Sequence, residues 1–465
     1  FKRNKNLGIE NDLAKSYEIS EDRLTWTVKI REDVKFTDGE NLTAEDVVYT
    51  YEIAKNSGSS IDLTMLDSVS KVDDYTVEFK LKNPQSTFIE KLATVGIVPK
   101  HAHNEGFSDN PIGSGPYKLV QWDKGQQVIA EANENYYGEK PSIKKLTMVF
   151  MDDDTAYAAV KAGEVDIASI PGSFAKEEVE GKKLIELDSI ETYGVAYPME
   201  QPGKTTADGY PIGNAVTSDE TIRKALTYAI DREELVEGIL EGYGAPSSTG
   251  LEKMPWLNEE TIIKPEEDGK IDEAKKMLEE AGWKDTNNNG TIDKNGVEAE
   301  FDLLYTDGKY RQELGLAYVE VAKKLGIKVN LENRNWDTIV PEINSQAVLY
   351  GFGSGDPSEI YNLYSSKTFG VGVPWNNSGY YQNDKVDEYI DKALQSEDED
   401  SALEYWKKAQ WDGETGFSHM GDCAYTWFVN AGHLYLADED LDIGTPVVQP
   451  HGGKVLYNIT EWSWK

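Results

Sequence analysis

Two hydrophobic periodicities alternate along the whole 465-residue chain. The segments 24–30 and 75–81 place apolar residues at every second position, which is typical of half-buried strands. The segments 222–230, 271–281 and 314–325 place them at i, i+3, i+4 and i+7, which is typical of amphipathic helices. Because strands and helices alternate, we expect an α/β fold rather than an all-β fold.

Several helix ends are also marked in the sequence. Thr43 can cap a helix, since its hydroxyl can accept from a backbone N–H and acidic residues follow it. Thr217 precedes Glu220 at the spacing of a capping box. Gly282 and Gly326 stand just after two of the helical segments, where a helix often ends with a left-handed residue. These positions predict the limits of the helices.

The composition is strongly acidic, with 47 Lys and Arg against 84 Asp and Glu, a net charge of −37. Nucleic acid and acidic membrane surfaces are unfavourable partners, because both would repel this chain. Its single cysteine, Cys423, excludes an intramolecular disulfide and a CxxC motif. No apolar run approaches the roughly 18 residues of a transmembrane helix. The length suggests about three domains, or two large lobes.

A series of motifs runs in a fixed order along nearly the whole chain. One is Ile222-Arg-Lys-Ala-Leu-Thr-Tyr-Ala-Ile-Asp-Arg232, and another is Pro111-Ile-Gly-Ser-Gly-Pro-Tyr117. The others span residues 24–39, 42–47, 133–138, 162–167, 279–283 and 379–383. Together they resemble the motifs of the family 5 extracellular solute-binding proteins, the large bilobed binders of peptide and nickel ABC importers.

The resemblance implies a bilobed α/β fold of the periplasmic-binding-protein (Venus-flytrap) type, with an extra N-terminal subdomain. It implies a non-catalytic binder whose two lobes close on a ligand, with the hinge near residues 217 and 428. The expected parts are an outer subdomain (1–110) packed on the first lobe, a first lobe (111–217), a second lobe (218–428) and a return to the first lobe (429–465).

The resemblance also implies partners and a location. The ligand would be a short peptide, and the alternative is a nickel chelate or another small solute. A monomer would deliver it to the permease and ATPase subunits of an ABC importer, from the periplasm or from the cell surface as a lipoprotein. Only eleven residues precede the block matching residues 12–17. Family members normally carry some tens there, including a strand and a signal peptide, so we expect the true beginning to be missing.

Asp356 is the candidate anchor for a ligand amine. In peptide-binding members an Asp after an aromatic residue of the second lobe has this role, and the segment Tyr350-Gly-Phe-Gly-Ser-Gly-Asp-Pro-Ser358 resembles that region. The alternative is that Asp356 caps the turn or helix that follows. The arginines that some members direct at the ligand carboxylate have no counterpart here, and Arg334 is the nearest cation. This departure weakens the peptide assignment specifically.

Aromatic and histidine side chains supply further candidates. Each aromatic could instead belong to the core, since the chain has 11 Trp and 26 Tyr. His419, in a Gly-flanked loop, could face a nickel chelate, as could the pair His101 and His103, which an extended strand would place on one side. The candidate cleft walls are Trp336, Trp375, Tyr380, Tyr381, Tyr425 and Trp427.

One loop has the oxygen-ligand spacing of a calcium site, with glycine at position 6. Position 12 is Gly296, where a bidentate Glu belongs, and Glu298 comes two residues later. The alternative is a polar hairpin turn rich in Asn and Gly. No cofactor is otherwise required, and a structural calcium is the one metal considered. The ligand candidates are Asp285, Asn287, Asn289, Thr291 and Asp293.

Catalytic motifs do not stand out in the sequence. It contains no HExxH, GxSxG or P-loop, and no GxGxxG after a strand. A secreted glycoside hydrolase that uses an Asp/Glu pair is the rival from another class, but no spacing favours it. We therefore expect a binding protein and not an enzyme.

Overall fold

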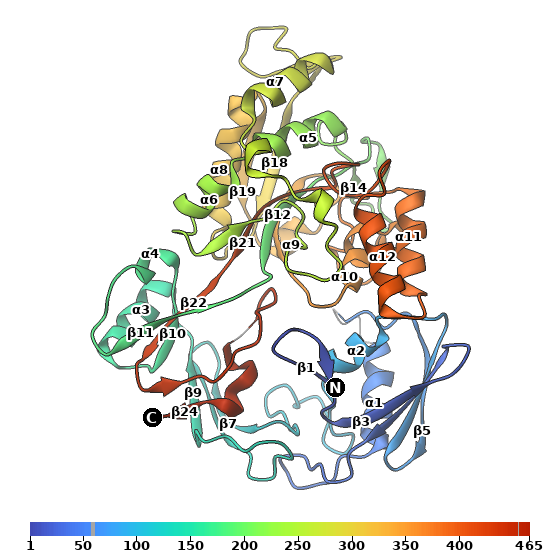
Figure 1. Ribbon diagram of the computed structural model, residues 1–465, viewed down its shortest axis with the longest axis vertical. Helices are drawn as coiled ribbons and strands as arrows, with labels where there is room; N and C mark the ends of the chain where they lie inside the picture. The colour runs from blue at the N-terminus through green and yellow to red at the C-terminus, as the bar shows by residue number, and fades with distance from the viewer. Residues whose placement is uncertain (57–60, 454) are drawn as a thin grey trace.

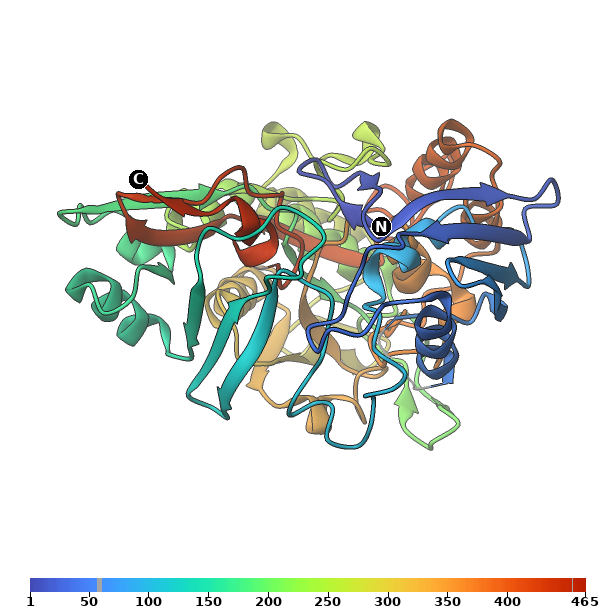
Figure 2. The same cartoon turned by 90° about the horizontal axis from the view of Figure 1, so that it is seen from below.

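The structure is a computed structural model, and it describes residues 1–56, 61–453 and 455–465. One large sheet occupies the upper half of Figure 1. Two smaller bodies lie below it, the first lobe on the left and the outer subdomain on the right. Figure 2 shows the same two bodies side by side from below.

The large sheet of the second lobe has the order β15-β21-β12-β20-β18-β19. β18 pairs in parallel with both β19 and β20, whereas β12 is antiparallel to β20 and β21. The carboxyl ends of the three parallel strands therefore meet at one edge, where open α/β sheets usually bind ligands. The strands are β12 (Thr192–Ala196), β15 (Gly244–Pro246), β18 (Glu300–Tyr305), β19 (Lys328–Asn333), β20 (Ala347–Phe352) and β21 (Tyr425–Ala431).

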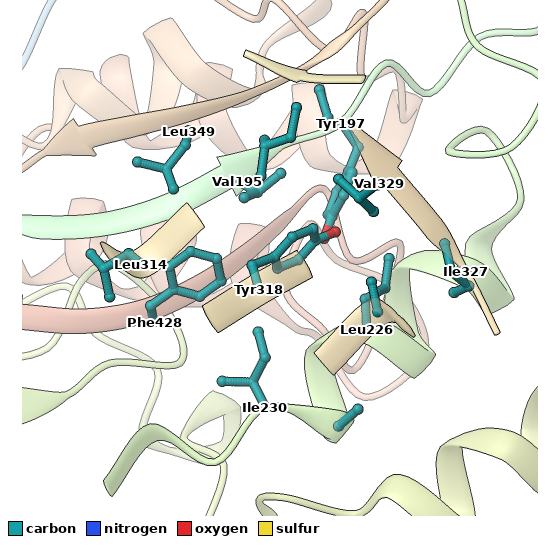
Figure 3. Close-up of a cluster of buried hydrophobic side chains, with 14 of the residues drawn as sticks. Val195, Tyr197, Leu226, Ile230, Leu314, Tyr318, Ile327, Val329, Leu349 and Phe428 are labelled. Atoms are coloured by element: carbon teal, nitrogen blue, oxygen red, sulfur yellow. The ribbon is translucent and has the colours of Figure 1, made fainter. Parts of the chain in front are cut away.

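Helices cover both faces of this sheet, because its strands are apolar on both sides. One core joins Val195, Leu349 and Phe428 to Leu226 and Tyr318 of the helices shown in Figure 3. The helices of this face are α5 (Glu220–Ala229), α6 (Arg232–Gly238), α7 (Ile271–Glu280) and α8 (Arg311–Lys324). Those of the second core are α9 (Trp336–Ile339), α10 (Ser358–Tyr364), α11 (Asp384–Leu394) and α12 (Glu399–Gln410).

The first lobe is built on the sheet β10-β22-β11, and the sheet β7-β8-β9 adjoins it. Tyr117 of β7 packs into the core formed by Leu187, Tyr435 and Trp462, which connects the two sheets. The elements are β7 (Tyr117–Asp123), β8 (Gln127–Ala132), β9 (Lys145–Val149), α3 (Asp153–Ala162), β10 (Ile167–Ser169), α4 (Gly172–Ala175), β11 (Lys182–Leu187), β22 (His433–Asp438), β23 (Leu441–Asp442), a 3₁₀ segment (Val455–Glu461) and β24 (Ser463–Trp464).

The outer subdomain has its own sheet, β3-β4-β6-β5, and its own core. The inward positions of β4, Trp26, Val28 and Ile30, are buried as the alternation predicts. The elements are β1 (Lys2–Arg3), β2 (Ile9–Glu10), β3 (Ala14–Ile19), β4 (Thr25–Ile30), α1 (Ala44–Asn56), β5 (Leu66–Asp73), β6 (Thr76–Leu81) and α2 (Phe88–Thr94).

Short elements complete the described chain. Three further 3₁₀ turns lie at Glu259–Thr261, Pro265–Glu267 and Ser366–Thr368. Two short hairpins are β13 (Lys204–Thr205) with β14 (Pro211–Ile212), and β16 (Asp293–Lys294) with β17 (Val297–Glu298). No helix within the described ranges combines the length and the apolar character that a membrane span needs.

The chain crosses between the lobes at residues 188–191 and at Gly432. The first crossing lies earlier than the predicted residue 217, because β12 belongs to the large sheet. All five residues of β12 are buried, so its sequence lacks an alternation that could show which sheet it joins. The return lies close to the predicted residue 428. The second lobe therefore begins at β12.

A buried carboxylate joins the two crossings. Glu191 accepts hydrogen bonds from His433 at 2.6 Å, from His451 at 3.1 Å and from the Tyr193 hydroxyl at 2.7 Å. Burial alone would raise the pKa of Glu191, but the histidine hydrogen bonds outweigh it and hold that pKa far below its usual range. The carboxylate is thus charged at neutral pH and links both crossings to the C-terminal segment.

Most of the predicted helix limits are confirmed. α1 begins after Thr43, whose hydroxyl accepts from the Glu45 N–H. Gly282 and Gly326 both adopt positive φ directly after the helix ends. The cap of α5 was predicted wrongly, since Asp219 is its N-cap. Thr217 instead donates its hydroxyl to the Pro198 carbonyl, a contact between distant segments that the local pattern cannot reveal.

Candidate functional site

A hollow of about 1130 Å³ lies at the carboxyl edge of β18 and β19. Its walls are residues that follow these two strands together with α9 and the residues after it. In the same loop Lys309 donates to Ser169 Oγ at 3.1 Å and to the Ile170 carbonyl at 3.0 Å, and both belong to the first lobe. The hollow therefore opens beside the boundary between the lobes. Its lining is Thr306, Asp307, Arg311, Asn333, Arg334, Asn335, Trp336, Asp337, Thr338, Pro341 and Glu342.

Two arginines of the hollow differ in how they are paired. Arg334 is held by Glu332 and, at 2.8 Å, by Glu342. Arg311 donates to the neutral oxygens of Thr306 and of the Asp307 backbone, and its buried Nε has no hydrogen-bond partner among the described residues. No carboxylate of the described chain lies within ion-pair distance of Arg311. Its positive charge is thus available to a ligand.

One of the predicted aromatic walls, Trp336, lies at this hollow, and a second, Trp375, packs beside it. Trp336 lines it, and its ring lies 5.5 Å from that of Trp375. Trp336 also stacks on Tyr350 at 5.9 Å, so its position is fixed by the core beneath. Both tryptophans are only partly buried. They form an aromatic surface that apolar side chains can contact without a fixed geometry.

Asp356 lies at the same edge of the sheet, after β20, but it is buried with 9% exposure. Its Oδ1 accepts the Ser358 N–H at 2.8 Å, so Asp356 binds the first residue of α10, in line with the capping alternative, although the N-cap position itself is Pro357. Its Oδ2 accepts from Lys91 Nζ at 2.8 Å, and Lys91 also donates to Ser358 Oγ at 2.9 Å. Lys91 comes from α2 of the outer subdomain. The amine-anchor role of Asp356 stays a prediction.

A second ion pair lies beside the first. Arg3 pairs with Glu90 at 2.6 Å and donates to the Gly355 carbonyl at 3.1 Å. Burial raises the pKa of Glu90 to about 7, against the lowering effect of Arg3, and the negative charge of Asp356 adds to the rise. These residues, Arg3, Glu90, Lys91, Asp356 and Ser358, form a sealed group that we call the corner.

The remaining aromatic candidates lie away from the hollow. Tyr381, Tyr425 and Trp427 are at most 6% exposed and belong to the second core of the large sheet. Tyr381 donates its hydroxyl to Asp422 at 2.8 Å, and Tyr425 stacks on Trp427. Tyr380 is half-buried and stacks on Phe369. These placements match the core alternative, and a ligand contact by any of them stays a prediction.

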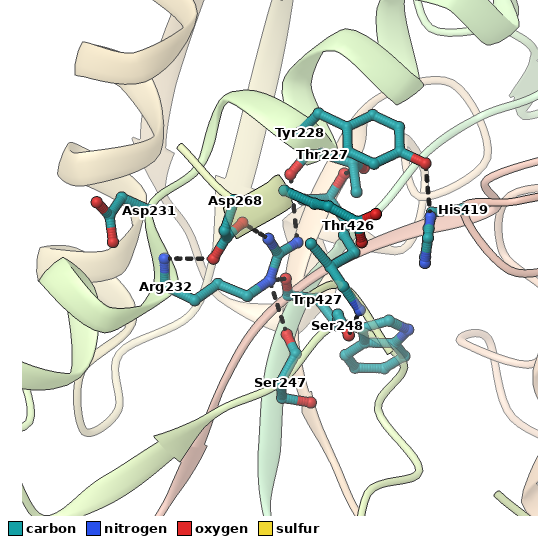
Figure 4. A network of polar contacts seen from close by, with 12 residues as sticks. Thr227, Tyr228, Asp231, Arg232, Ser247, Ser248, Asp268, His419, Thr426 and Trp427 are labelled. Atoms are coloured by element: carbon teal, nitrogen blue, oxygen red, sulfur yellow. Dashed lines mark hydrogen bonds and ion pairs between the residues drawn. The ribbon is translucent and has the colours of Figure 1, made fainter. Parts of the chain in front are cut away.

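His419 is part of the buried polar network in Figure 4. Its Nδ1 lies 2.9 Å from the Tyr228 hydroxyl, and its Nε2 lies 2.9 Å from the Thr261 carbonyl. A carbonyl can only accept, so Nε2 carries the hydrogen and Nδ1 accepts from Tyr228. Burial lowers the pKa of His419 to about 4, which keeps the ring neutral. Both nitrogens are already used.

The centre of the same network is Arg232, which is 1% exposed. It pairs with Asp268 and donates its Nε to the carbonyls of Trp427 at 2.9 Å and Ser247 at 3.0 Å (Figure 4). An arginine inside a core is tolerated only when such partners surround it. Arg232 therefore fixes β21 and β15 in place and has a structural role.

The chain was then compared with known proteins. Residues 8–372 match the family described as bacterial extracellular solute-binding proteins, family 5. This chain belongs to that family. It is 34% identical to Protein XP55 of Streptomyces lividans over 455 residues, which cover 94% of this chain and 79% of that protein.

Two solved structures of family 5 proteins are similar over almost the whole chain. The oligopeptide-binding protein AppA of Bacillus subtilis is 30% identical over 486 residues, covering 99% of this chain and 84% of that protein. Its structure with a nonapeptide has a TM-score of 0.80 at 27% identity and covers 100% and 92% of the chains. NikZ from Campylobacter jejuni, solved with Ni(L-His), has a TM-score of 0.84 at 25% identity and covers 99% and 92%. The bilobed α/β fold is thereby confirmed.

Two residues that the structure brings forward, one in the hollow and one in the corner, were not among the candidates from the sequence. Arg311 is the first residue of α8, and in the sequence it looks like any charged residue on a helix surface. Only its place in the hollow separates it from those residues. Lys91 lies in a short helix of the outer subdomain, 265 residues before its partner Asp356. A lysine at the apolar face of α2, between Phe88 and Leu92, was a signal that it is buried.

The calcium-like loop is held by its own hydrogen bonds. Asp285 accepts the backbone N–H groups of Asn289 and Gly290, and Asn289 Oδ1 accepts that of Thr291. Asn287 accepts the Asn289 N–H, and both asparagines donate to Glu298. Asp293 is turned to Thr286, away from the other candidate ligands. Calcium binding stays a prediction.

Other metal candidates are separated in space. His101 lies 2.7 Å from Asp38, whereas His103 lies 2.9 Å from the Tyr49 hydroxyl, so the two rings have different neighbours. Within the described ranges no group of three His, Cys, Asp or Glu side chains is arranged to hold a metal ion.

Proposed function

We propose that this family 5 protein captures short peptides between its lobes and delivers them to the permease of an ABC importer. The observation that carries the proposal is the hollow at the lobe boundary, which combines an aromatic surface, Trp336, with an unpaired cation, Arg311. A peptide offers the complementary groups, namely varied side chains and one carboxylate. The peptide-bound structure of AppA, similar over the whole chain, supports this ligand class.

In this proposal the ligand is bound and released without a chemical reaction. Ligand contacts with both lobes favour the closed arrangement by their differential affinity for it. A micromolar ligand corresponds to about −8 kcal/mol, which several backbone hydrogen bonds, one ion pair and an aromatic contact can supply. We therefore infer a non-enzymatic monomer outside the cytoplasm, with the permease and ATPase subunits as partners.

Arg311 gives this proposal a specific test. Replacing it by Gln in the Arg311→Gln variant should weaken binding of peptides with a free C-terminal carboxylate by about tenfold, the loss of one charge-assisted contact. Peptides with an amidated C-terminus should bind wild type and variant alike. The matched control is Arg334→Gln, since Arg334 is already neutralised by Glu332 and Glu342. Equal losses for both peptide types would contradict the role of Arg311.

Ligand identity is tested by denaturing the purified protein and reading the released molecules by mass spectrometry. Mixed short peptides would support the proposal. A nickel chelate is the second candidate, favoured by the likeness to NikZ, which was solved with Ni(L-His). It would be indicated if nickel with histidine, but not peptide, raised the melting temperature.

A further inference from the structure

The guanidinium of Arg311 is positioned by the loop that joins β18 to α8, residues 306–310. It donates to the Thr306 hydroxyl and to the Asp307 carbonyl of this loop. The side chain also lies across Gly308, where a Cβ atom would stand 3.2 Å from Arg311 Nη1. Because this contact leaves no spare room, a shift of the loop backbone would move the guanidinium with it.

Another residue of the loop, Tyr310, has a strained backbone. Its φ is +62°, in the left-handed region that residues other than glycine seldom adopt. Such a conformation persists only where surrounding contacts hold it. The Tyr310 ring packs edge-on against Tyr193 of β12, with 6.3 Å between the ring centroids. This contact supports the loop from the second lobe.

Lys309 supplies the support from the first lobe. Its Nζ donates to Ser169 Oγ at 3.1 Å and to the Ile170 carbonyl at 3.0 Å. Ile170 is completely buried and donates its own N–H to the Leu434 carbonyl of β22 at 3.0 Å. The acceptors of Lys309 therefore lie at the end of β10, in the sheet of the first lobe, and do not move independently of it.

The contact of Lys309 is not an ion pair. Both of its acceptors are neutral, and no carboxylate of the described residues lies within ion-pair distance of its Nζ. Burial lowers the pKa of Lys309, although the charges of Asp153 and Glu191 act in the opposite direction. Neutral acceptors stabilise an ammonium less than a carboxylate does, so this contact is weaker than that of Lys91 with Asp356. It can therefore break and form again as the lobes move.

We propose that Lys309 is a positioning residue, which docks the β18–α8 loop on the first lobe and thereby holds Arg311 where a ligand carboxylate reaches it. The carboxylate contact is then complete only while the loop is in contact with the first lobe. This inference rests on the proposed function, because it concerns how the same site holds the same class of ligand.

Pairs of short peptides with one sequence, one with a free C-terminal carboxylate and one amidated, test the inference by titration calorimetry. In Lys309→Met the affinity for the carboxylate form should fall about fivefold, because Arg311 is no longer held in place. The affinity for the amidated form should stay within about twofold of wild type. A fall of equal size for both forms, or for neither, would overturn the positioning role.

The double variant Lys309→Met/Arg311→Gln tests whether the two side chains act through each other. If Lys309 acts only by placing Arg311, the double variant should bind the carboxylate form within about twofold of Arg311→Gln alone. Losses that multiply, so that the double variant is about fivefold weaker than Arg311→Gln, would show that Lys309 acts independently and would overturn the inference.

Two matched changes show whether docking is the cause. Lys309→Arg keeps a cation that can donate to Ser169 and Ile170, so it should keep the wild-type preference for the carboxylate form. Lys323→Met removes a lysine of α8 whose side chain is 75% exposed and paired with Glu320, and it should also keep the preference. A preference in Lys309→Arg as weak as that in Lys309→Met would contradict the proposal.

A separate variant approaches the contact from the first lobe. Ser169→Ala removes one acceptor of Lys309 and leaves the loop sequence unchanged, so it gives an answer even if Lys309→Met fails to fold. The preference for the carboxylate form should fall by about twofold or more, and an unchanged preference would overturn the inference. Wild-type protein that binds neither peptide form would instead reject the proposed function.

Discussion

The hollow and the corner occupy the same edge of the same sheet, yet their charges are used in opposite ways. In the hollow, after β18 and β19, Arg311 has no carboxylate partner within the described chain and Trp336 borders open space. In the corner, after β20, Lys91 and Asp356 satisfy one another. The strand ends create both positions, but the outer subdomain covers only one of them.

Because of this difference, the corner should contribute to the free energy of unfolding and the hollow to the free energy of ligand binding. Charged groups in the corner are removed from water and paired with each other, so changing them should alter the free energy of unfolding. Side chains in the hollow still have charge or surface without a partner in the chain, so changing them should alter ligand affinity. Each variant below is chosen to affect one quantity and leave the other, and a variant that affects both would break the comparison.

The largest effect is expected from Asp356→Asn. The amide can still accept the Ser358 N–H, but it leaves the buried Lys91 ammonium without a charge partner. The free energy of unfolding should fall by about 3–5 kcal/mol, measured by chemical denaturation. The double variant Lys91→Met/Asp356→Leu, which removes both charges, should recover most of the loss. A single variant as stable as wild type would mean that the corner is not sealed.

Trp336→Ala should have the next largest effect, and on affinity. Removing the indole deletes the aromatic surface of the hollow, and peptide affinity measured by titration calorimetry should fall by about 10- to 100-fold. The melting temperature should change little, because the ring is only partly buried. Trp122→Ala is the matched control, since Trp122 is 41% exposed on a different sheet. Equal peptide affinities for the two variants would show that the hollow is not part of the binding site.

Glu359, which follows Ser358 of the corner in α10, allows a neighbouring internally bonded carboxylate to be tested by pH. It accepts the Gly353 and Ser354 N–H groups, but burial outweighs these bonds and raises its pKa to about 7. The folded protein then keeps a proton that the unfolded chain loses above its ordinary pKa near 4.5. Stability should therefore decline as the pH rises from about 4.5 to 7.

In Glu359→Gln this decline should be smaller, because the amide does not titrate. Melting temperatures measured across that pH range would show it as a flatter curve, with a gain of roughly 1–3 °C at the alkaline end. The control is Glu388→Gln, because Lys392 and Lys385 lower the pKa of Glu388 to about 2 and it stays charged throughout. A curve for Glu359→Gln parallel to that of wild type would refute this assignment.

The sequence predicted well what local pattern controls. The alternation at 24–30 and 75–81 became β4 and β6, and the apolar stripes became α5, α7 and α8. Pattern could not assign β12 to the second lobe, because sheet membership depends on partners such as β20 and β21 that lie more than 150 residues away. The family motifs supplied the bilobed architecture that periodicity alone leaves open.

The site was predicted less completely, and for one physical reason. Trp336 and Asp356 lie after β19 and β20 at the carboxyl edge of the large sheet, and a ligand contact by either residue or by Trp375 stays a prediction. Whether a charge faces a ligand depends on its partner, and Lys91 lies 265 residues from Asp356. Tyr425 and Trp427 were selected for their aromatic character, but every residue of their strand is buried, so neither side chain is free to reach a ligand in this arrangement. Burial and pairing are tertiary properties.

The smallest effect is expected at the loop of Asp285, which extends the comparison to a third set of charges. Like the corner, it has satisfied its oxygens internally, with Asp285 accepting two backbone N–H groups and Asp293 held by Thr286. Calcium would have to replace these bonds while Gly296 offers no side chain at position 12. Titration to millimolar calcium should therefore leave the melting temperature within about 1 °C. A rise of several degrees that disappears in Asp285→Asn would show that the loop rearranges to bind calcium. A carboxylate with partners inside the chain could then still bind an ion, which would contradict the comparison.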